Sequence, residues 1–448
     1  MVEGIANGVE DYLIDGLSFK LPPGATYITD RKSVTYYTSG SNEYSTSGTK
    51  LIKIVANSDG WMDPSTLRIT FDVFNKGPPG ALLRPISGGW SFFRRMRILS
   101  GGCILEDISD FNRTQELFTT LISKNSKTNV DAEGFGLPAF DYATDETVAN
   151  FPGIPSGEYQ TISFTPLSGI LSQPKYLPLR YLNGLTLELE MVSDPTVPFV
   201  LNTIAPFTTA NTSITWVIQN VQMKCDIVTL DNALDNSYAE LLLSGKSLPI
   251  SYSTYISQYQ SILNGTNSFG ATVGQQKVRL NVARSLSRLK SVFVSFDKAN
   301  TVPSAVYKDF NSFYSPMMTT ADVPIMGQEG EVEWQMQLGN KLYPETPVRS
   351  HSESFYQLRK CLGVQSSALH SFNIDGQSYR RRRFVIAMDT EAVLQASFSG
   401  KNTRAGDLLN IKFEHLGTDS TKYAHNMYVI LHSDNIMEIR DSGVVVYD

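Results

Sequence analysis

Apolar and polar side chains alternate along several stretches of the chain, as they do in a strand with one buried face. In residues 184–191 every second side chain is apolar: Leu185, Leu187, Leu189 and Met191. Residues 67–73 and 221–227 alternate in the same way, and the second stretch places Cys225 on its apolar face. Because a period of two matches the side-chain period of a strand, these stretches predict antiparallel sheets with one face toward water.

Three shorter segments show the helical period instead, with apolar residues spaced three and four apart. They lie near residues 114–122, over residues 231–243, and directly after Ser350. In the third segment Ser350 stands three residues before Glu353, as in a capping box, and Gly363 follows the last turn. The pattern therefore predicts a mainly β chain with a few short helices.

The two halves of the chain carry the same order of segments. Residues 66–76 align with residues 288–298 at an offset of 222, and half of the 448 residues is 224. The alignment pairs two phenylalanines of each half: Phe71 with Phe293, and Phe74 with Phe296. Further along, each half has a hairpin with a small-residue turn, at residues 97–106 and 335–345, and then a helix. We interpret this series as a tandem duplication of one all-β unit.

Each unit of a little over 200 residues holds about eight strands of ~5–6 residues with generous loops, which fits a jelly roll. The fold class that we predict is all-β, with two tandem eight-stranded antiparallel jelly rolls and short helices in the connections. The predicted divisions are an N-terminal arm (1–16), a first roll (17–230), and a second roll (231–448) that begins with the linking helix 231–243.

The composition narrows the class of protein. Hydrophobic residues make up 41% of the chain and aromatic residues 11%, which excludes a disordered chain and a coiled coil. The net charge is −6 and the pI is near 5.5, so a strongly basic nucleic-acid wrapper is not expected. The three cysteines are far apart in sequence and odd in number, so they predict neither a disulfide framework nor a zinc ribbon.

The first residues carry acidic side chains where a secretion signal needs basic ones followed by an apolar run. No stretch approaches the ~18 apolar residues of a membrane span. We therefore expect a soluble protein that is made in a reducing compartment.

The common motifs of catalysis and phosphate binding are missing: Gly-x-Ser-x-Gly, the Gly-x-x-x-x-Gly-Lys loop and His-Glu-x-x-His. His415, His425 and His432 would form a metal site if they met in space, but their spacing does not support one. Isolated histidines on strands more often fill the core or the surface. We expect no enzyme activity, no cofactor and no metal.

Two other features have both a functional and a structural interpretation. The four tryptophans would serve as sugar-binding platforms if exposed, but aromatic residues on strands are more often core: Trp61, Trp90, Trp216 and Trp334. The long loops near residues 125–160 and 299–330 exceed ordinary connections and are expected to make contacts. The acidic residues of the first loop lack an EF-hand spacing, so a solvated outer loop is favoured over a calcium site: Asp131, Glu133, Asp141, Asp145 and Glu146.

Three segments resemble the major capsid proteins of polinton-like viruses, which are small double-stranded DNA viruses and integrated elements of unicellular eukaryotes. They are residues 175–190, 231–240 and 339–347. The resemblance covers nearly the whole chain and extends to virophage and giant-virus capsid proteins. It implies a double jelly roll, with three copies forming a pseudo-hexameric capsomer that tiles an icosahedral shell.

The resemblance also implies a set of partners and a location. The partners are further copies of the chain, neighbouring capsomers, a penton protein and minor capsid proteins, together with non-specific contact to packaged DNA and no membrane insertion. The location is the virion, after synthesis in the host cytoplasm and assembly in cytoplasm or nucleus. The alternative function is that of a carbohydrate-binding jelly-roll protein, lectin-like or used for host attachment.

Two arginine clusters are the sharpest charge features of the chain. One is the run Arg380, Arg381, Arg382 and Arg383, and the other includes Arg94 and Arg95. We expect them first at a subunit interface or in local ion pairs, and second at an inner surface that meets DNA or minor proteins. A nuclear import signal ranks third, and a solvated strand edge is the structural alternative.

The N-terminal arm contains apolar residues but is too short to form its own core. Ile5, Tyr12 and Leu13 are the candidate contact residues. We expect the arm to pack under a roll or under a neighbouring capsomer at the inner surface.

Overall fold

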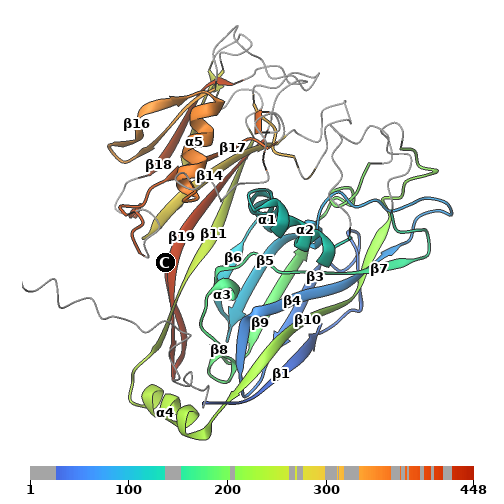
Figure 1. The fold of residues 1–448 in the computed structure, drawn as a ribbon, viewed down its shortest axis with the longest axis vertical. Helices are drawn as coiled ribbons and strands as arrows, with labels where there is room; N and C mark the ends of the chain where they lie inside the picture. The colour runs from blue at the N-terminus through green and yellow to red at the C-terminus, as the bar shows by residue number, and fades with distance from the viewer. Residues whose placement is uncertain are drawn as a thin grey trace, which may run out of the picture.

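The fold was analysed in a computed structural model, and Figure 1 shows its two groups of sheets. The description covers residues 27–136, 153–201, 207–261, 268–269, 276–297, 310, 312–316, 332–364, 374, 379–380, 383–393, 398–404, 408–416 and 426–448.

Strands between residues 28 and 230 form the first pair of sheets. One sheet has the order β1-β10-β4-β7, with the short strands β2 and β8 attached, and the other has the order β3-β9-β5-β6. The bounds are β1 (Ile28–Tyr37), β2 (Glu43–Tyr44), β3 (Leu51–Ala56), β4 (Trp61–Asn75), β5 (Phe93–Ser100), β6 (Cys103–Ile108), β7 (Tyr159–Phe164), β8 (Leu177–Pro178), β9 (Leu185–Met191) and β10 (Trp216–Leu230).

Strands between residues 248 and 447 form the second pair. One sheet has the order β11-β19-β14-β17, with β20 on β19, and the other has the order β12-β13-β18-β15-β16. The bounds are β11 (Leu248–Ser261), β12 (Ser268–Phe269), β13 (Gln276–Val282), β14 (Leu289–Asp297), β15 (Glu333–Leu338), β16 (Lys341–Arg349), β17 (Val385–Asp389), β18 (Leu409–Leu416), β19 (Asn426–Arg440) and β20 (Gly443–Tyr447).

The two pairs of sheets share one strand order. If the eight principal strands of each half are counted along the chain, leaving out β2, β8, β12 and β20, both halves give the orders 1-8-3-6 and 2-7-4-5. These two four-stranded antiparallel sheets, connected in this way, make a jelly roll. The predicted fold class, a double jelly roll, is therefore confirmed.

Alternation of side chains produces the core of each roll, as the sequence predicts. Strand β9 buries every second residue from Leu185 to Met191, and Cys225 on β10 is buried. In the first roll Phe71 is fully buried and meets Phe92, Phe93 and Phe164 edge-on, at ring-centroid distances of 5.4, 5.5 and 6.2 Å. Such contacts between the two sheets hold each roll closed.

Helices occupy the connections, and the three predicted helices are present. They are α1 (Phe111–Thr120), α4 (Asn232–Leu243), which joins the rolls, and α5 (His351–Cys361). In α5 the Ser350 side chain accepts from the Glu353 N–H while Glu353 accepts from the Arg349 N–H, so a capping arrangement starts this helix. Among the described residues no helix has the length and apolar character of a membrane span.

Within the described ranges, further helical segments lie in the connections. They are α2 (Lys124–Glu133), α3 (Gly169–Ser172) and the 3₁₀ turns η3 (Gly89–Phe92) and η5 (Leu179–Leu182). Helix α2 corrects the expectation of a loop from residue 125 onward. Its sequence is almost entirely polar, so it has no apolar stripe, and its start is set locally by the Ser123 cap on the Ser126 N–H.

The strands of the proposed repeat correspond, but the aligned phenylalanines do not face the same way. Strands β4 and β14 hold the same place in their sheets. Phe71 points into its roll, whereas Phe293 points outward and lies 5.0 Å from Phe118 of α1. Phe296 points inward, 5.6 Å from Phe413 of the facing sheet. The offset that pairs Phe71 with Phe296 aligns two side chains that both face the core. It differs from the offset of 222 by an odd number of residues, and successive side chains of a strand point to opposite faces.

The buried and exposed positions predict that alanine substitutions on two neighbouring strands of the first roll differ in their effect on the free energy of unfolding. Phe71→Ala on β4 should lower the free energy of unfolding by about 3–5 kcal/mol, because it empties a packed aromatic site. Tyr159→Ala on β7, where the side chain is 61% exposed, should change it by less than ~0.5 kcal/mol. Urea unfolding of both variants measures the difference, and equal losses would contradict this assignment of the core.

Candidate functional site

The two rolls bury side chains in each other along one contact, which we call the seam. Leu117 of α1 and Leu121, which caps the end of this helix, come from the first roll but belong to the apolar cluster of the second roll. In return, β11 and β19 contribute four residues to the cluster of the first roll: Ile250, Tyr252, Met437 and Ile439. Figure 1 shows these two long strands running down beside the first roll toward α4. The seam is therefore a continuation of both cores.

Aromatic packing and one close backbone approach define the centre of the seam. The ring of Phe118 lies 4.8 Å from that of Tyr255 and 5.0 Å from that of Phe293. A Cβ atom at Gly169 would lie 1.7 Å from the carbonyl oxygen of Ser253. Only glycine fits this position without displacing the backbone of the opposite roll.

Glu106 of β6 is a buried carboxyl group at the seam. It accepts hydrogen bonds from the Ser168 hydroxyl and the Gly169 N–H of its own roll, and from the Thr254 hydroxyl of the second roll at 3.0 Å. Burial raises the pKa of Glu106, and the hydrogen bonds oppose this rise. The carboxyl group therefore links the two rolls, because it accepts hydrogen bonds from donors of both.

Arg113 of α1 is the cationic counterpart of Glu106 in the seam, and its side chain is almost fully buried. It donates to the carbonyl oxygens of Phe310 and, at 3.1 Å, Ser312. Its guanidinium lies 3.8 Å from a carboxylate oxygen of Asp297 and 4.6 Å from the ring centroid of Phe313. These contacts offset the cost of removing the charge from water and tie α1 to the segment that follows β14.

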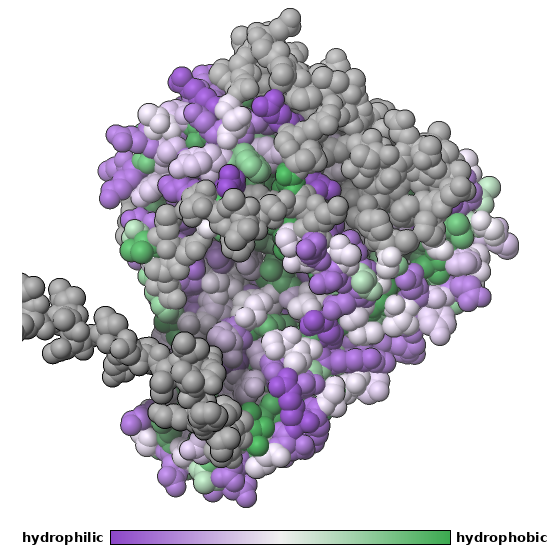
Figure 2. Space-filling model, in the orientation of Figure 1, coloured by the Kyte–Doolittle hydropathy of each residue, from purple (hydrophilic) through white to green (hydrophobic). Residues whose placement is uncertain are grey.

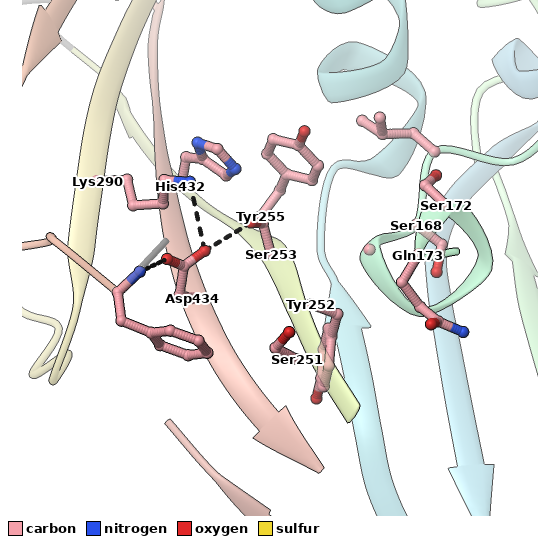
Figure 3. A pocket seen from close by; sticks show the side chains of 13 residues that line it. Ser168, Ser172, Gln173, Ser251, Tyr252, Ser253, Tyr255, Lys290, His432 and Asp434 are labelled. Atoms are coloured by element: carbon pink, nitrogen blue, oxygen red, sulfur yellow. Dashed lines mark hydrogen bonds and ion pairs between the residues drawn. The ribbon is translucent and has the colours of Figure 1, made fainter. Parts of the chain in front are cut away.

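A polar cleft of about 340 Å³ opens beside the seam, and Figure 3 shows its lining. Asp434 accepts from the Ser253 hydroxyl at 2.6 Å and lies 3.5 Å from the Lys290 ammonium. His432 stacks on Tyr255 at 4.9 Å, and burial lowers its pKa to about 4. The charged groups of the cleft are thus paired with each other and its histidine is neutral near pH 7, an arrangement that suits packing between the rolls.

The first arginine cluster lies on the outer surface of the sheet β3-β9-β5-β6. Arg95 forms a bidentate pair with Asp107 on β6 (2.8 and 2.6 Å), and Arg97 lies 2.8 Å from Glu188 on β9. Arg94 is exposed. Two of these arginines are therefore engaged in cross-strand ion pairs within the chain.

The second arginine cluster lies where the chain enters β17. Arg380 and Arg383 are half-buried, and Arg383 forms a parallel bridge to Phe313. Burial, and then the charge of Arg380, lower the pKa of the buried His351 to about 4. Arg381, Arg382, and the arm residues Ile5, Tyr12 and Leu13 lie outside the described residues.

The other candidate residues are placed as follows. The side chain of His432 is described, whereas His425 lies outside the described residues and His415 is described only by its backbone. Within the described part of the chain no three His, Cys, Asp or Glu residues are grouped to hold a metal. Asp131 and Glu133 belong to α2, where Glu133 pairs with Arg68 at 3.2 Å. Their three acidic neighbours lie outside the described residues: Asp141, Asp145 and Glu146.

All four tryptophans are buried in the rolls, and three have their ring N–H satisfied internally. The acceptors are Glu116 for Trp90 (2.7 Å), the Pro195 carbonyl for Trp216 (2.8 Å), and Ser354 for Trp334 (2.9 Å). Side chains held in this way do not offer a flat exposed platform for a sugar. The structural interpretation of the tryptophans is confirmed.

The seam residues were not among the candidates chosen from the sequence. Two signals pointed to them: Glu106 interrupts an apolar strand, and the run Val292-Phe293-Val294 has no polar alternation. A continuous apolar run marks a strand that is buried on both faces.

No protein-family model and no curated protein sequence matches the chain. Several solved structures do match the chain in fold. PBCV-1 VP54, fitted into a reconstruction of the virophage Sputnik, gives a TM-score of 0.62 at 12% identity, covering 96% of this chain and 99% of that one. The Sputnik virophage structure gives 0.60 at 8% identity, covering 98% and 93%. The Faustovirus major capsid protein gives 0.58 at 8% identity, covering 95% and 93%. The chain thus shares the fold of these proteins over nearly its whole length.

The geometry of Glu106 predicts a pH-dependent stability. A carboxyl whose pKa is raised by folding binds a proton more tightly in the folded chain, so its contribution to stability falls as pH rises above the unfolded value of 4.5. Glutamine does not titrate, so the Glu106→Gln variant lacks this decrease in stability with rising pH. The stability of Glu106→Gln relative to the wild type should therefore increase between about pH 5 and about pH 8. Urea unfolding at both pH values tests this, and a pH-independent difference would contradict it.

Proposed function

We propose that the chain is a major capsid protein: a structural subunit of the icosahedral shell of a double-stranded DNA virus, without catalytic activity. The observation that carries the proposal is the pair of jelly rolls with one strand order, joined by a buried seam. Its support is the shared fold with PBCV-1 VP54 and the Faustovirus major capsid protein over at least 93% of every chain compared.

The seam gives a physical reason for such a role. Two rolls held at a fixed angle expose two surfaces of similar shape to neighbouring molecules. Three copies around a threefold axis then place six rolls in a ring, which fills a site of sixfold shape in a closed shell. A flexible link between the rolls would not do so, because each roll would then take its own orientation.

We propose the domain limits that the repeat suggests, with an arm (1–16), a first roll (17–230) and a second roll (231–448). The sheet pairings support the limit at residue 231, since every strand pair of the described sheets joins strands from one side of it. The proposed partners are further copies of the chain, a penton protein and minor capsid proteins, with non-specific contact to packaged DNA. The proposed location is the virion, after synthesis in the host cytoplasm.

The first test is the mass of the purified full-length chain. Size-exclusion chromatography with light scattering should give a particle of three times 49.7 kDa. The trimer should persist on dilution, because a permanent capsomer interface buries more than ~2,000 Å². A stable monomer that binds a glycan array would overturn the capsid proposal and favour attachment to carbohydrate.

A second test concerns the run Arg380–Arg383, which we propose lies near a subunit boundary. Exposed ion pairs contribute only ~0–1 kcal/mol each. The apolar contacts between subunits should therefore supply the affinity, and the arginines should fix how the subunits align. The double variant Arg381→Glu/Arg383→Glu should therefore form trimers more slowly or misassemble, with the monomer still folded.

Arg381→Lys/Arg383→Lys is the matched control, because it keeps both positive charges and should assemble normally. Light scattering over time measures assembly, and circular dichroism measures folding. Normal trimers from the glutamate variant would exclude an interface role and favour contact with an inner surface.

A further inference from the structure

An apolar groove of about 520 Å³ lies at the base of the molecule, where the two rolls are joined. The linking helix α4, the start of β1, the start of β11 and the end of β19 form its walls. In Figure 1 this helix is at the lower end, and Figure 2 shows apolar residues exposed in the same region of a mostly polar surface. Residues 174–176 and 178 also line the groove, and its apolar residues include Tyr27, Ile28, Trp61, Leu234, Tyr238 and Pro249.

Helix α4 leaves much of its apolar side uncovered within the described chain. Leu242 is its one buried residue, whereas Leu234 and Tyr238 are half-buried and face the groove. Tyr238 lies 4.9 Å from the ring of Trp61, and Arg180 holds Asp235 at 3.0 Å. These contacts fix the position of the helix. Its apolar side remains partly exposed, so further apolar side chains can pack against it.

The described chain begins at this groove. Tyr27 is the first described residue, it lines the groove, and its carbonyl oxygen accepts from the Asp231 N–H at 2.8 Å. Tyr27 is 61% exposed and Ile28 is 38% exposed. The chain therefore enters the described part of the structure at this groove.

The segment just before this point has a suitable sequence. Leu17, Phe19 and Leu21 alternate with polar residues, which gives an extended segment one apolar edge. Pro22-Pro23-Gly24 follows and is typical of a turn. Phe19 lies eight positions before Tyr27, a distance of up to ~26 Å along an extended chain, so the segment can fold back over the groove of its own chain.

We propose that residues 17–21 dock in this groove of the same chain, with Leu17, Phe19 and Leu21 against Leu234 and Tyr238. The groove has the volume of a site for a few side chains rather than for a folded partner. Docking covers the apolar side of α4 and directs residues 1–16 away from the base. The proposal stands whether or not the chain forms a capsid.

Cysteine cross-linking in the full-length chain tests the docking. Phe19→Cys is combined with Leu234→Cys, in a background where the half-buried Cys103 is replaced by serine. The half-buried Cys361 is likewise replaced by serine, whereas Cys225 is buried and burial raises its pKa to about 12, so this thiol stays unreactive. Mild oxidation should give a disulfide between positions 19 and 234 within one chain, identified by peptide mass spectrometry.

The matched control pairs Phe19→Cys with Leu243→Cys. Leu243 is on the same helix but 75% exposed and outside the groove, so its disulfide should form at least ~10-fold more slowly. Equal rates for the two pairs, or no 19–234 disulfide in a folded variant, would overturn the proposal. A 19–234 disulfide that joins two chains would also overturn it, because residues 17–21 would then dock on a neighbour.

Pro249→Cys provides a second partner position if Leu234→Cys does not fold. Pro249 lines the groove and is exposed, so replacing its side chain removes no buried contact. Phe19→Cys/Pro249→Cys should then form the intrachain disulfide, and its absence in the folded variant would count against docking. The oligomer mass of the unoxidised variants is measured separately. It tests the capsid proposal independently of the docking result.

Discussion

The buried seam between the two jelly rolls is the contact on which the rest of the architecture depends. Each roll has its own pair of sheets, and outside the seam the described connection between them is the helix α4. Glu106 and Arg113 bury one charge-bearing group of each sign in the seam, and both reach partners on the opposite side. Breaking such a contact leaves buried polar groups without partners, at a cost of about 1–3 kcal/mol for each neutral group and more for a charged one. The seam therefore favours one relative orientation of the rolls over all others.

A fixed orientation would let the two rolls act as one building unit of the proposed capsid. The strand order is the same in both rolls, so the chain presents two similar sets of loops and edges. The seam itself is asymmetric, because Phe118 of α1 in the first roll packs against Phe293 and Tyr255 of the second. One chain thus combines a repeated strand order with an asymmetric joint, as the proposed threefold oligomer of sixfold shape requires.

The sequence predicted what depends on local pattern and missed what depends on packing between the rolls. The strand β9, the hairpin turn at Gly101-Gly102 and the Ser350 cap are set by neighbouring residues, and all are visible in the alternation or the turn chemistry. Helix α2 was missed because its residues are polar. The direction of Phe293 was missed because β14 is buried on both faces, which removes the polar side that would fix its register. Glu106 shows in the sequence only as a charge that interrupts an apolar strand, because the donors that bind it, Ser168, Gly169 and Thr254, are distant in sequence.

Cryo-electron microscopy of the purified oligomer tests most directly the claim that the seam holds two rolls as one unit. The account predicts a particle with six lobes around a threefold axis, of two alternating kinds, with the density of Glu106 and Arg113 enclosed between the two lobes of each chain. Lobes that swivel independently, or a seam that is open to solvent in the assembled particle, would contradict it.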